Sequence, residues 1–246
     1  MNKEATRTQA VHRFREGKSL AVLTGAGISQ ESGIPTFRGP GGLWKNYRAE
    51  DLASPEAFAR DPRLVWEWYQ MRRGICEEAR PNAAHETVQA MEEGYDRFLL
   101  ITQNVDGLHG RAGSRKMEEI HGNIHRARCL DRGHVFDLQP GSREYPVLCA
   151  ECGEPARPHI VWFGESYDPD VLARVQAFIS SADLVLVVGT SGMVSMPTYL
   201  CAEARRAGAF ILEANLDDTE ITPLAHATLR GKAGEVLPSF WNEVRE

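Results

Sequence analysis

Four segments of this chain share one pattern, an apolar run that ends in small polar residues, and this pattern restricts the fold more than any other feature. The first run covers residues 20–24 and leads into Gly25, and the later runs lie within residues 97–109, 182–192 and 210–218. Short, nearly uninterrupted apolar runs are typical of strands that are buried on both faces. In open parallel sheets, ligands bind at the carboxyl ends of such strands. The sequence therefore predicts an α/β protein with a Rossmann-like parallel sheet and a ligand site along one sheet edge.

Helical patterns lie between these runs, at residues 5–16, 54–79 and 85–94, with Ser54 as the expected N-cap before Pro55. Residues 125–157 differ, because they contain several Gly and Pro residues and three clustered cysteines, and they predict an inserted module. We expect a large Rossmann-like domain and a smaller inserted domain that combines a helical module with the cysteine-bearing module. The expected boundaries are 1–35, 83–124 and 158–246 for the large domain, and 36–82 and 125–157 for the small one.

The turn after the first apolar run begins as a dinucleotide-binding turn and then departs from one. Gly25 and Gly27 stand where a phosphate-binding turn belongs, but Gln30 occupies the place of the third glycine of the G-x-G-x-x-G pattern. Gly33 and Pro35 interrupt the long helix that should follow. A dehydrogenase would keep the third glycine and usually an acidic residue at the end of the second strand, so the pattern counts against that class.

Composition excludes several other classes. The formal net charge is -6 and no long run of Lys and Arg occurs, which argues against nucleic acid as the main partner. No apolar run approaches the ~20 residues of a membrane span. The first 20 residues lack the apolar core of a signal peptide and include Glu4 and Glu16, so we expect a cytoplasmic protein. With 246 residues, the chain is long enough for one large domain with a small satellite.

Five motifs occur in the order and approximate spacing of one enzyme family. They are "GAGISQESGIPTFRGPGGLW", "TQNVDGLH", "EIHGN", "RPHIVWFGE" and "VVGTSG", and together they resemble the sirtuins, the NAD-dependent protein lysine deacylases. The resemblance covers nearly the whole chain, and the short chain and tight loops are similar to the bacterial members. It implies removal of acyl groups from protein lysines, with nicotinamide and O-acyl-ADP-ribose as products. "WEWYQMRR" and "RPHIVWFGE" resemble the class III branch, which favours the acidic succinyl, malonyl and glutaryl groups.

The resemblance also implies where NAD binds. The glycine turn would lie under the pyrophosphate, and the segment after it would be a mobile loop in which Phe37 shields the ribose and Arg38 contacts phosphate or ribose. Asp106 would hold the nicotinamide carboxamide. The residues implied to bind NAD are Gly25, Ala26, Gly27, Ile28, Ser29, Phe37, Arg38, Trp44, Gln103, Asn104, Val105, Asp106, Gly189, Thr190, Ser191, Asn215, Leu216, Asp217 and Ala233.

The catalytic residues implied by the resemblance are His121 and Asn104. His121 would be the general base that takes a proton from the ribose diol, and imidazole suits this role because its ordinary pKa lies near 6.5. Asn104 would hold ribose or water. Two other functions stay open on the same fold: an NAD glycohydrolase or mono-ADP-ribosyltransferase, and a non-catalytic NAD-sensing module.

The substrate side is implied in the same way. An acyl-lysine peptide would bind as an added strand, and we expect the protein to act on it as a monomer. The peptide contacts carried over are Val161, Phe163, Gly164, Glu165, Met193 and Val194. Tyr69 and Arg72 are three residues apart on one helix, so they share a face. They are either surface residues or, as the resemblance implies, the pair that binds the acyl carboxylate.

The cysteines predict either a metal site or its remnant. Cys149 and Cys152 form one Cys-x-x-Cys pair, whereas Cys129 has Arg132 where its partner would stand. The zinc site implied by the resemblance then needs a fourth ligand, which His134, a water or Asp131 could supply. The alternative is that the metal is lost and the module is held by packing. Cys76 and Cys201 lie in helical segments and are expected to be small buried apolar residues.

Overall fold

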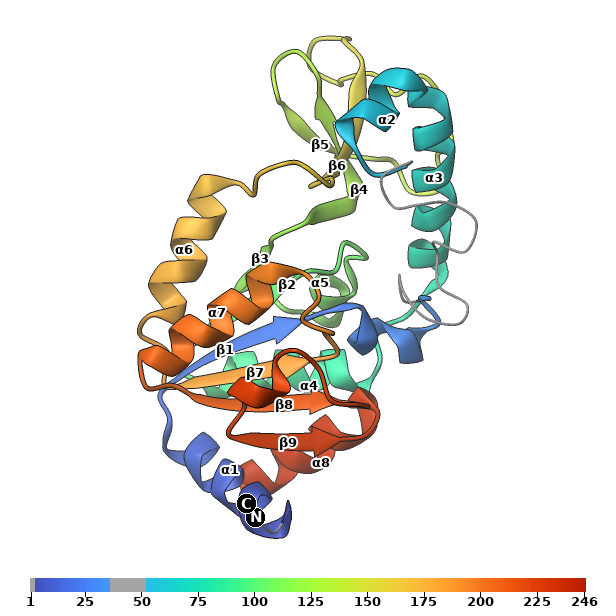
Figure 1. Cartoon of the computed structure of the whole chain (residues 1–246). Coiled ribbons are helices and arrows are strands. Elements are labelled where there is room, and N and C mark those ends of the chain that lie inside the picture. Colours follow the sequence, from blue (N-terminus) through green and yellow to red (C-terminus); the bar gives the residue numbers. More distant parts are fainter. Residues whose placement is uncertain (1–2, 36–51) are drawn as a thin grey trace.

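The computed structural model describes residues 3–35 and 52–246, and a six-stranded parallel sheet forms its larger part (Figure 1). The strand order is β3-β2-β1-β7-β8-β9. The chain order reverses between β1 and β7, which is the place where open α/β sheets form a ligand crevice. The strands are β1 (Ser19–Thr24), β2 (Arg97–Thr102), β3 (Met117–Glu119), β7 (Leu184–Val188), β8 (Phe210–Asn215) and β9 (Ala227–Arg230).

Helices cover both faces of this sheet, which explains why its strands read as continuous apolar runs. Helices α1 (Lys3–Glu16), α4 (Ala83–Gly94) and α8 (Ala233–Arg245) pack on one face, and α6 (Pro169–Ile179) and α7 (Ser195–Arg206) on the other. Short α5 (Leu108–Ala112) follows β2, and the 3-10 turn Thr222–Leu224 precedes β9. Within β1, Leu20 and Val22 enter one core while Ala21 and Leu23 enter the other. The predicted Rossmann-like fold is confirmed.

A three-stranded antiparallel sheet forms the smaller part, at the far end of the molecule from the two termini (Figure 1). Its order is β5 (Val135–Asp137), β4 (Gly122–Cys129) and β6 (Ala156–Ile160), and α2 (Pro55–Arg60) and α3 (Pro62–Glu78) lie beside it. Phe58, Trp66 and Trp162 share its separate apolar core. Ser54 caps α2 as predicted, since its hydroxyl accepts a hydrogen bond from the Ala57 amide at 3.2 Å.

Three local features differ from the expectation or sharpen it. Only a 3-10 helix, Ala26–Ser32, follows β1, and it ends at Gly33 with a φ of 83° in the left-handed region. Segment 161–165, which carries most of the expected peptide contacts, is not a strand, because β6 ends at Ile160. On α3, Trp66 is buried in the core, whereas Met71 is exposed. No helix among the described residues is long and apolar enough to cross a membrane.

Candidate functional site

The carboxyl ends of β1, β2, β7 and β8 meet at a pocket of about 440 Å³, which we call the sheet-edge pocket. The strand-end residues predicted from the sequence line it together: Gly25, Ala26, Gly27, Gln103, Asn104, His121, Gly189, Thr190, Ser191, Asn215, Leu216, Asp217 and Ala233. Sequence reasoning missed Gln30, Glu31, Asp218 and Lys232, which also line it. Glu31 accepts a hydrogen bond from the Gly234 amide at 2.8 Å, and nothing local in the sequence indicated this long-range contact.

The glycine turn forms the floor of the sheet-edge pocket by packing against a second turn. The Gly27 amide donates to the Gly189 carbonyl at 2.8 Å, and the Gly25 amide donates to the Val188 carbonyl at 3.0 Å. A Cβ on Gly27 would lie 2.7 Å from the Gly189 Cα, which leaves no room for any side chain. Gly189 itself has a φ of 59°. Such close-packed glycine turns let a backbone approach a phosphate group, so the floor fits a pyrophosphate.

A smaller cavity of about 30 Å³ lies beyond the turn, and we call it the inner cavity. The Ser29 hydroxyl donates a hydrogen bond to the Asp106 carboxylate at 2.7 Å. The side-chain amide of Asn104 donates to the Ser29 hydroxyl at 3.0 Å and to the Gly25 carbonyl at 3.1 Å. Burial raises the pKa of Asp106, while hydrogen bonds from the Leu108 amide and Ser29 lower it. Ser29, Asn104 and Asp106 therefore form one buried polar cluster at the inner cavity, and Val105 lines the cavity beside them.

The structure adds detail to two predictions near the inner cavity, one for Ile28 and one for Cys76. Ile28 lines neither pocket, because its side chain is in the core beside α4 and α8. Cys76 is buried, as expected, but it also lines the inner cavity. Burial raises the pKa of its thiol to about 12, so the thiol is neutral there. Phe37, Arg38 and Trp44 lie outside the described residues.

His121 is half-buried in the turn between β3 and β4 and lines two pockets. Its Nδ1 lies 3.0 Å from the Gln103 carbonyl oxygen and its Nε2 lies 3.4 Å from the Tyr167 hydroxyl. A carbonyl oxygen only accepts, so Nδ1 carries the hydrogen and Nε2 has the lone pair. Burial lowers the pKa of His121, which favours this neutral form at neutral pH. His121 therefore presents a basic nitrogen at the junction of the two pockets.

The second pocket, of about 290 Å³, lies between the two sheets, and we call it the inter-sheet pocket. It is lined by His121, Gln103, Tyr69, Arg72, Trp162, Val161, Phe163, Gly164, Glu165 and Val194, among others. Met193, predicted to join them, is not part of this wall and is 62% exposed. The Glu165 carboxylate accepts hydrogen bonds from Arg157 and from the Trp162 amide, at 2.8 Å for the amide. Glu165 therefore stabilises the shape of segment 161–165.

Tyr69 and Arg72 are buried, with exposed fractions of 2% and 6%, so the surface alternative for them is wrong. The Tyr69 hydroxyl accepts a hydrogen bond from the Trp162 indole at 2.9 Å. The Arg72 guanidinium lies 4.4 Å from the centre of the Trp68 ring and 5.3 Å from that of Tyr69, within cation–π range. Burial lowers the pKa of Arg72, and Tyr69 opposes that shift. The two residues form one rigid group on the wall of the inter-sheet pocket.

The cysteine-bearing module holds a candidate metal centre. Cys129, His134, Cys149 and Cys152 place their ligand atoms within 4.8 Å of one another. The His134 Nδ1 lies 3.6 Å from the Cys149 sulfur, so His134 takes the place of the missing fourth thiol. Arg132 does not join the group through its side chain, because only its amide contacts Cys129, at 3.4 Å. Three thiols and one imidazole are a closed structural zinc set, so the site is consistent with zinc.

We expect protein purified without chelator to contain about one zinc per chain, because structural sites with four ligands hold the ion tightly. His134→Ala should lower the zinc content and the melting temperature. His12→Ala, an exposed position on α1, is the matched control and should change neither. Metal analysis by mass spectrometry measures both variants. Less than about a tenth of an equivalent in the parent protein would mean that packing alone holds the module.

Comparison with known proteins is consistent with this arrangement. The model of the Sir2 family matches residues 25–196. The chain is 50% identical over 228 residues to the Pyrobaculum aerophilum protein named "NAD-dependent protein deacylase 2", covering 93% of this chain and 92% of the relative. It is 48% identical over 235 residues to the Leptospira interrogans protein named "NAD-dependent protein deacylase", covering 95% of each. A solved structure described as a "Sir2 homolog-NAD complex" matches with a TM-score of 0.91 and 44% identity, covering 97% of this chain and 93% of that one.

Proposed function

Because the chain belongs to the Sir2 family, we propose that it is an NAD-dependent protein lysine deacylase. The observation that carries the proposal is the position of His121, which lines both the sheet-edge pocket and the inter-sheet pocket. A base at this junction reaches a nucleotide in one pocket and an acyl-lysine in the other. We also propose that two domains share the site. Residues 1–35, 83–124 and 158–246 form the domain that binds NAD, and residues 36–82 and 125–157 form the domain that completes the substrate side.

The sheet-edge pocket fits NAD along its length. The turn at Gly25 and Gly27 would hold the pyrophosphate, and Asn215 and Asp217 would hold the adenosine end. Asn104 and Asp106 would hold the nicotinamide end at the inner cavity. When bound, NAD supplies a ribose carbon that accepts the acyl oxygen as nicotinamide leaves.

His121 moves the proton in this scheme. Its Nδ1 hydrogen bond to Gln103 fixes the ring, so that Nε2 takes a proton from a ribose hydroxyl beside it. The Tyr167 ring is stacked with the His121 ring at 5.7 Å and restricts its rotation. The deprotonated hydroxyl oxygen would then attack the acyl carbon, a water molecule would complete the transfer, and O-acyl-ADP-ribose and free lysine would be the products.

The inter-sheet pocket would take the acyl-lysine. A peptide lying as an added strand between segment 161–165 and Val194 would direct its lysine toward His121. At the end of that pocket, Arg72 and Tyr69 would meet the acyl group. A guanidinium and a phenol match a carboxylate, so we propose that succinyl, malonyl or glutaryl groups are removed at least as well as acetyl. We further propose that the protein acts in the cytoplasm as a monomer and, because its net charge is -6, without nucleic acid.

Nicotinamide release tests the proposal. Purified protein with NAD should release nicotinamide only when an acylated peptide is added, and deacylated peptide should appear in equal amount. Release without peptide would support the NAD glycohydrolase or mono-ADP-ribosyltransferase alternative. No release under either condition would favour a non-catalytic NAD sensor.

A further inference from the structure

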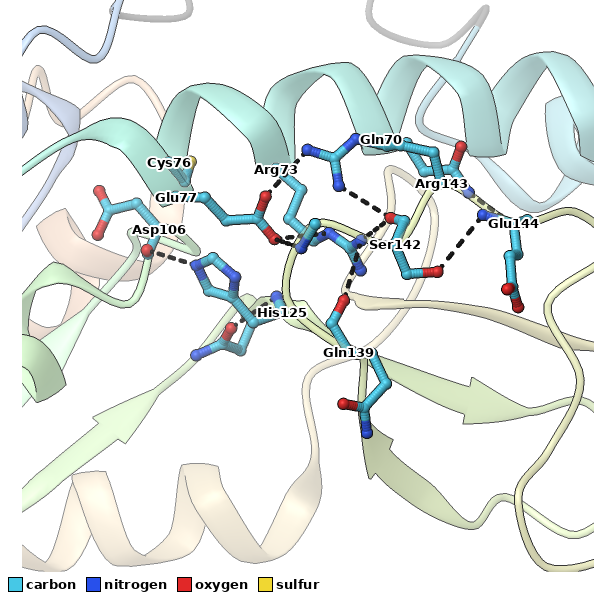
Figure 2. Close-up of polar contacts among 12 residues, drawn as sticks. Gln70, Arg73, Cys76, Glu77, Asp106, His125, Gln139, Ser142, Arg143 and Glu144 are labelled. Atoms are coloured by element: carbon cyan, nitrogen blue, oxygen red, sulfur yellow. Dashed lines mark hydrogen bonds and ion pairs between the residues drawn. The ribbon is translucent and has the colours of Figure 1, made fainter.

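Helix α3 is fastened to the cysteine-bearing module by a group of polar contacts on one side of the helix (Figure 2). Gln70, Arg73 and Glu77 contribute from α3, and the segment 139–144, between β5 and Cys149, contributes mainly backbone groups. We call this group the α3 clamp. It lies outside the three cavities described above.

The contacts of the α3 clamp are dense and specific. Arg73, only 3% exposed, donates to the carbonyls of Ser142 and Gln139, and its guanidinium lies 3.3 Å from Glu77. The side-chain amide of Gln70 donates a hydrogen bond to the backbone carbonyl of Glu144 at 2.8 Å. Burying an arginine is costly unless it is paired, and two carbonyls and the Glu77 carboxylate around the Arg73 guanidinium offset that cost.

Glu77 joins the helix to the same segment a second time. Its carboxylate accepts hydrogen bonds from the Gly141 amide at 3.2 Å and from Arg143 at 2.9 Å. Burial would raise the pKa of Glu77, but the hydrogen bonds from Arg143 and Gly141 lower it below its ordinary value. Gly74 lets the segment come close, since a Cβ there would lie 2.9 Å from the Arg143 guanidinium.

The α3 clamp and the pair formed by Tyr69 and Arg72 occupy adjacent faces of helix α3. Tyr69 and Arg72 precede Gln70 and Arg73 by one position each, and they point into the inter-sheet pocket. The C-terminal end of α3 also contacts the larger part of the molecule, because Arg111 of α5 donates a hydrogen bond to the Cys76 carbonyl at 2.9 Å. Any rotation or shift of α3 permitted by loss of the clamp would therefore move the Arg72 guanidinium.

We infer that Arg73 is a positioning residue for acyl selectivity, which acts by holding α3 in the register that aims Arg72 at the acyl carboxylate. The inference rests on the proposed function. A bidentate contact to a carboxylate tolerates only about 0.5 Å of displacement. An acetyl group makes no such contact, so its removal depends far less on where Arg72 lies. The cysteine-bearing module thereby takes part in substrate choice, through segment 139–144.

Arg73→Met tests the inference by kinetics on matched succinyl and acetyl peptides. We expect the KM for the succinyl peptide to rise about tenfold, less than the ~100-fold that a 1 Å misplacement can cost, with kcat nearly unchanged. The values for the acetyl peptide should stay within about threefold. Arg63→Met is the matched control, because Arg63 is on the same helix in an exposed ion pair with Glu67. It should leave both peptides unchanged. Equal losses on both peptides with Arg73→Met would overturn the inference.

Two further variants cover the case in which Arg73→Met does not fold. Arg143→Met removes one contact from segment 139–144 to Glu77. It should therefore also raise the KM for the succinyl peptide. Arg73→Lys keeps the charge and some donors, so it should restore part of the selectivity. Hydrogen exchange measured on the free proteins should rise at residues 139–144 and along α3 in Arg143→Met, relative to Arg63→Met. Unchanged exchange and unchanged KM in Arg143→Met would overturn the inference.

These outcomes separate the inference from the proposed function. Absence of acyl-dependent nicotinamide release in the parent protein would refute the function, whereas the exchange measurement needs no substrate. Normal deacylation in the parent with equal effects on both peptides in the variants would refute only the role of Arg73.

Discussion

Replacing His121 with Ala is expected to lower the rate of deacylation by ~100-fold or more, because a general base typically contributes at least that factor. The side chain is half-buried and, among the described residues, its hydrogen bonds are to Gln103 and Tyr167, so the fold should survive its loss. Steady-state kinetics on an acylated peptide, with the melting temperature as the check on folding, measure the effect. His12→Ala is the control for loss of an imidazole elsewhere and should keep full activity. A folded His121→Ala protein that retains more than a few per cent of the parent's turnover would contradict the assignment.

The pH dependence of the parent enzyme checks the same assignment. The base acts in its neutral form, and burial lowers the pKa of His121 below the ordinary value of 6.5. Activity should therefore persist as the pH falls to 6.5 and decline only below it. The acid limb of the kcat/KM profile should disappear in His121→Ala. An acid limb centred above pH 6.5 would mean that another group is titrating.

Arg72→Met is expected to weaken removal of succinyl groups by ~1.5–3 kcal/mol, the range for hydrogen bonds to charged groups. That corresponds to a loss of roughly 10- to 150-fold in kcat/KM on a succinyl peptide, since 1.4 kcal/mol is a factor of ten. Deacetylation should stay within a few-fold of the parent, because an acetyl group has no carboxylate. Methionine keeps much of the volume and packs against Trp68, where the guanidinium lies now.

Matched kinetics on succinyl and acetyl peptides decide the outcome for Arg72. Met71→Ala is the control, since Met71 is the neighbouring residue on α3 and is 52% exposed. It should alter neither peptide. Equal losses on both peptides in Arg72→Met would mean that Arg72 has only a structural role, and the proposed acidic-acyl activity would be abandoned.

The large sheet can be predicted from local patterns in the sequence. Apolar runs buried on both faces read directly as strands of a parallel sheet, and the β1, β2, β7 and β8 segments were all predicted. Their polar ends belong at one edge because parallel strands share a direction, so the sheet-edge pocket followed from sequence alone. The cysteine spacing was equally local, and it indicated three of the four ligands at the candidate metal centre. The roles proposed for the individual residues stay predictions.

What the sequence alone could not decide depends on contacts between distant segments. Helical spacing put Tyr69 and Arg72 on one face, but only the packing of α3 against Trp162 showed that this face is buried. The sequence left the fourth ligand open among His134, a water and Asp131, and the structure favours His134 because it places the imidazole beside Cys149.

Tertiary contacts also explain two charged residues, Glu213 and Arg73, whose positions the local sequence pattern does not explain. Glu213 lies within the apolar β8 and is fully buried, because Arg230 of β9 pairs with it at 2.9 Å. Arg73 reads as one more charge on an amphipathic helix until segment 139–144 presents its carbonyls to it. A local pattern records which side chains avoid water, whereas a buried charge depends on a partner that only folding brings near. The sheet and its glycine turn were therefore determined by the sequence itself, and the walls of the inter-sheet pocket and the α3 clamp by the tertiary structure.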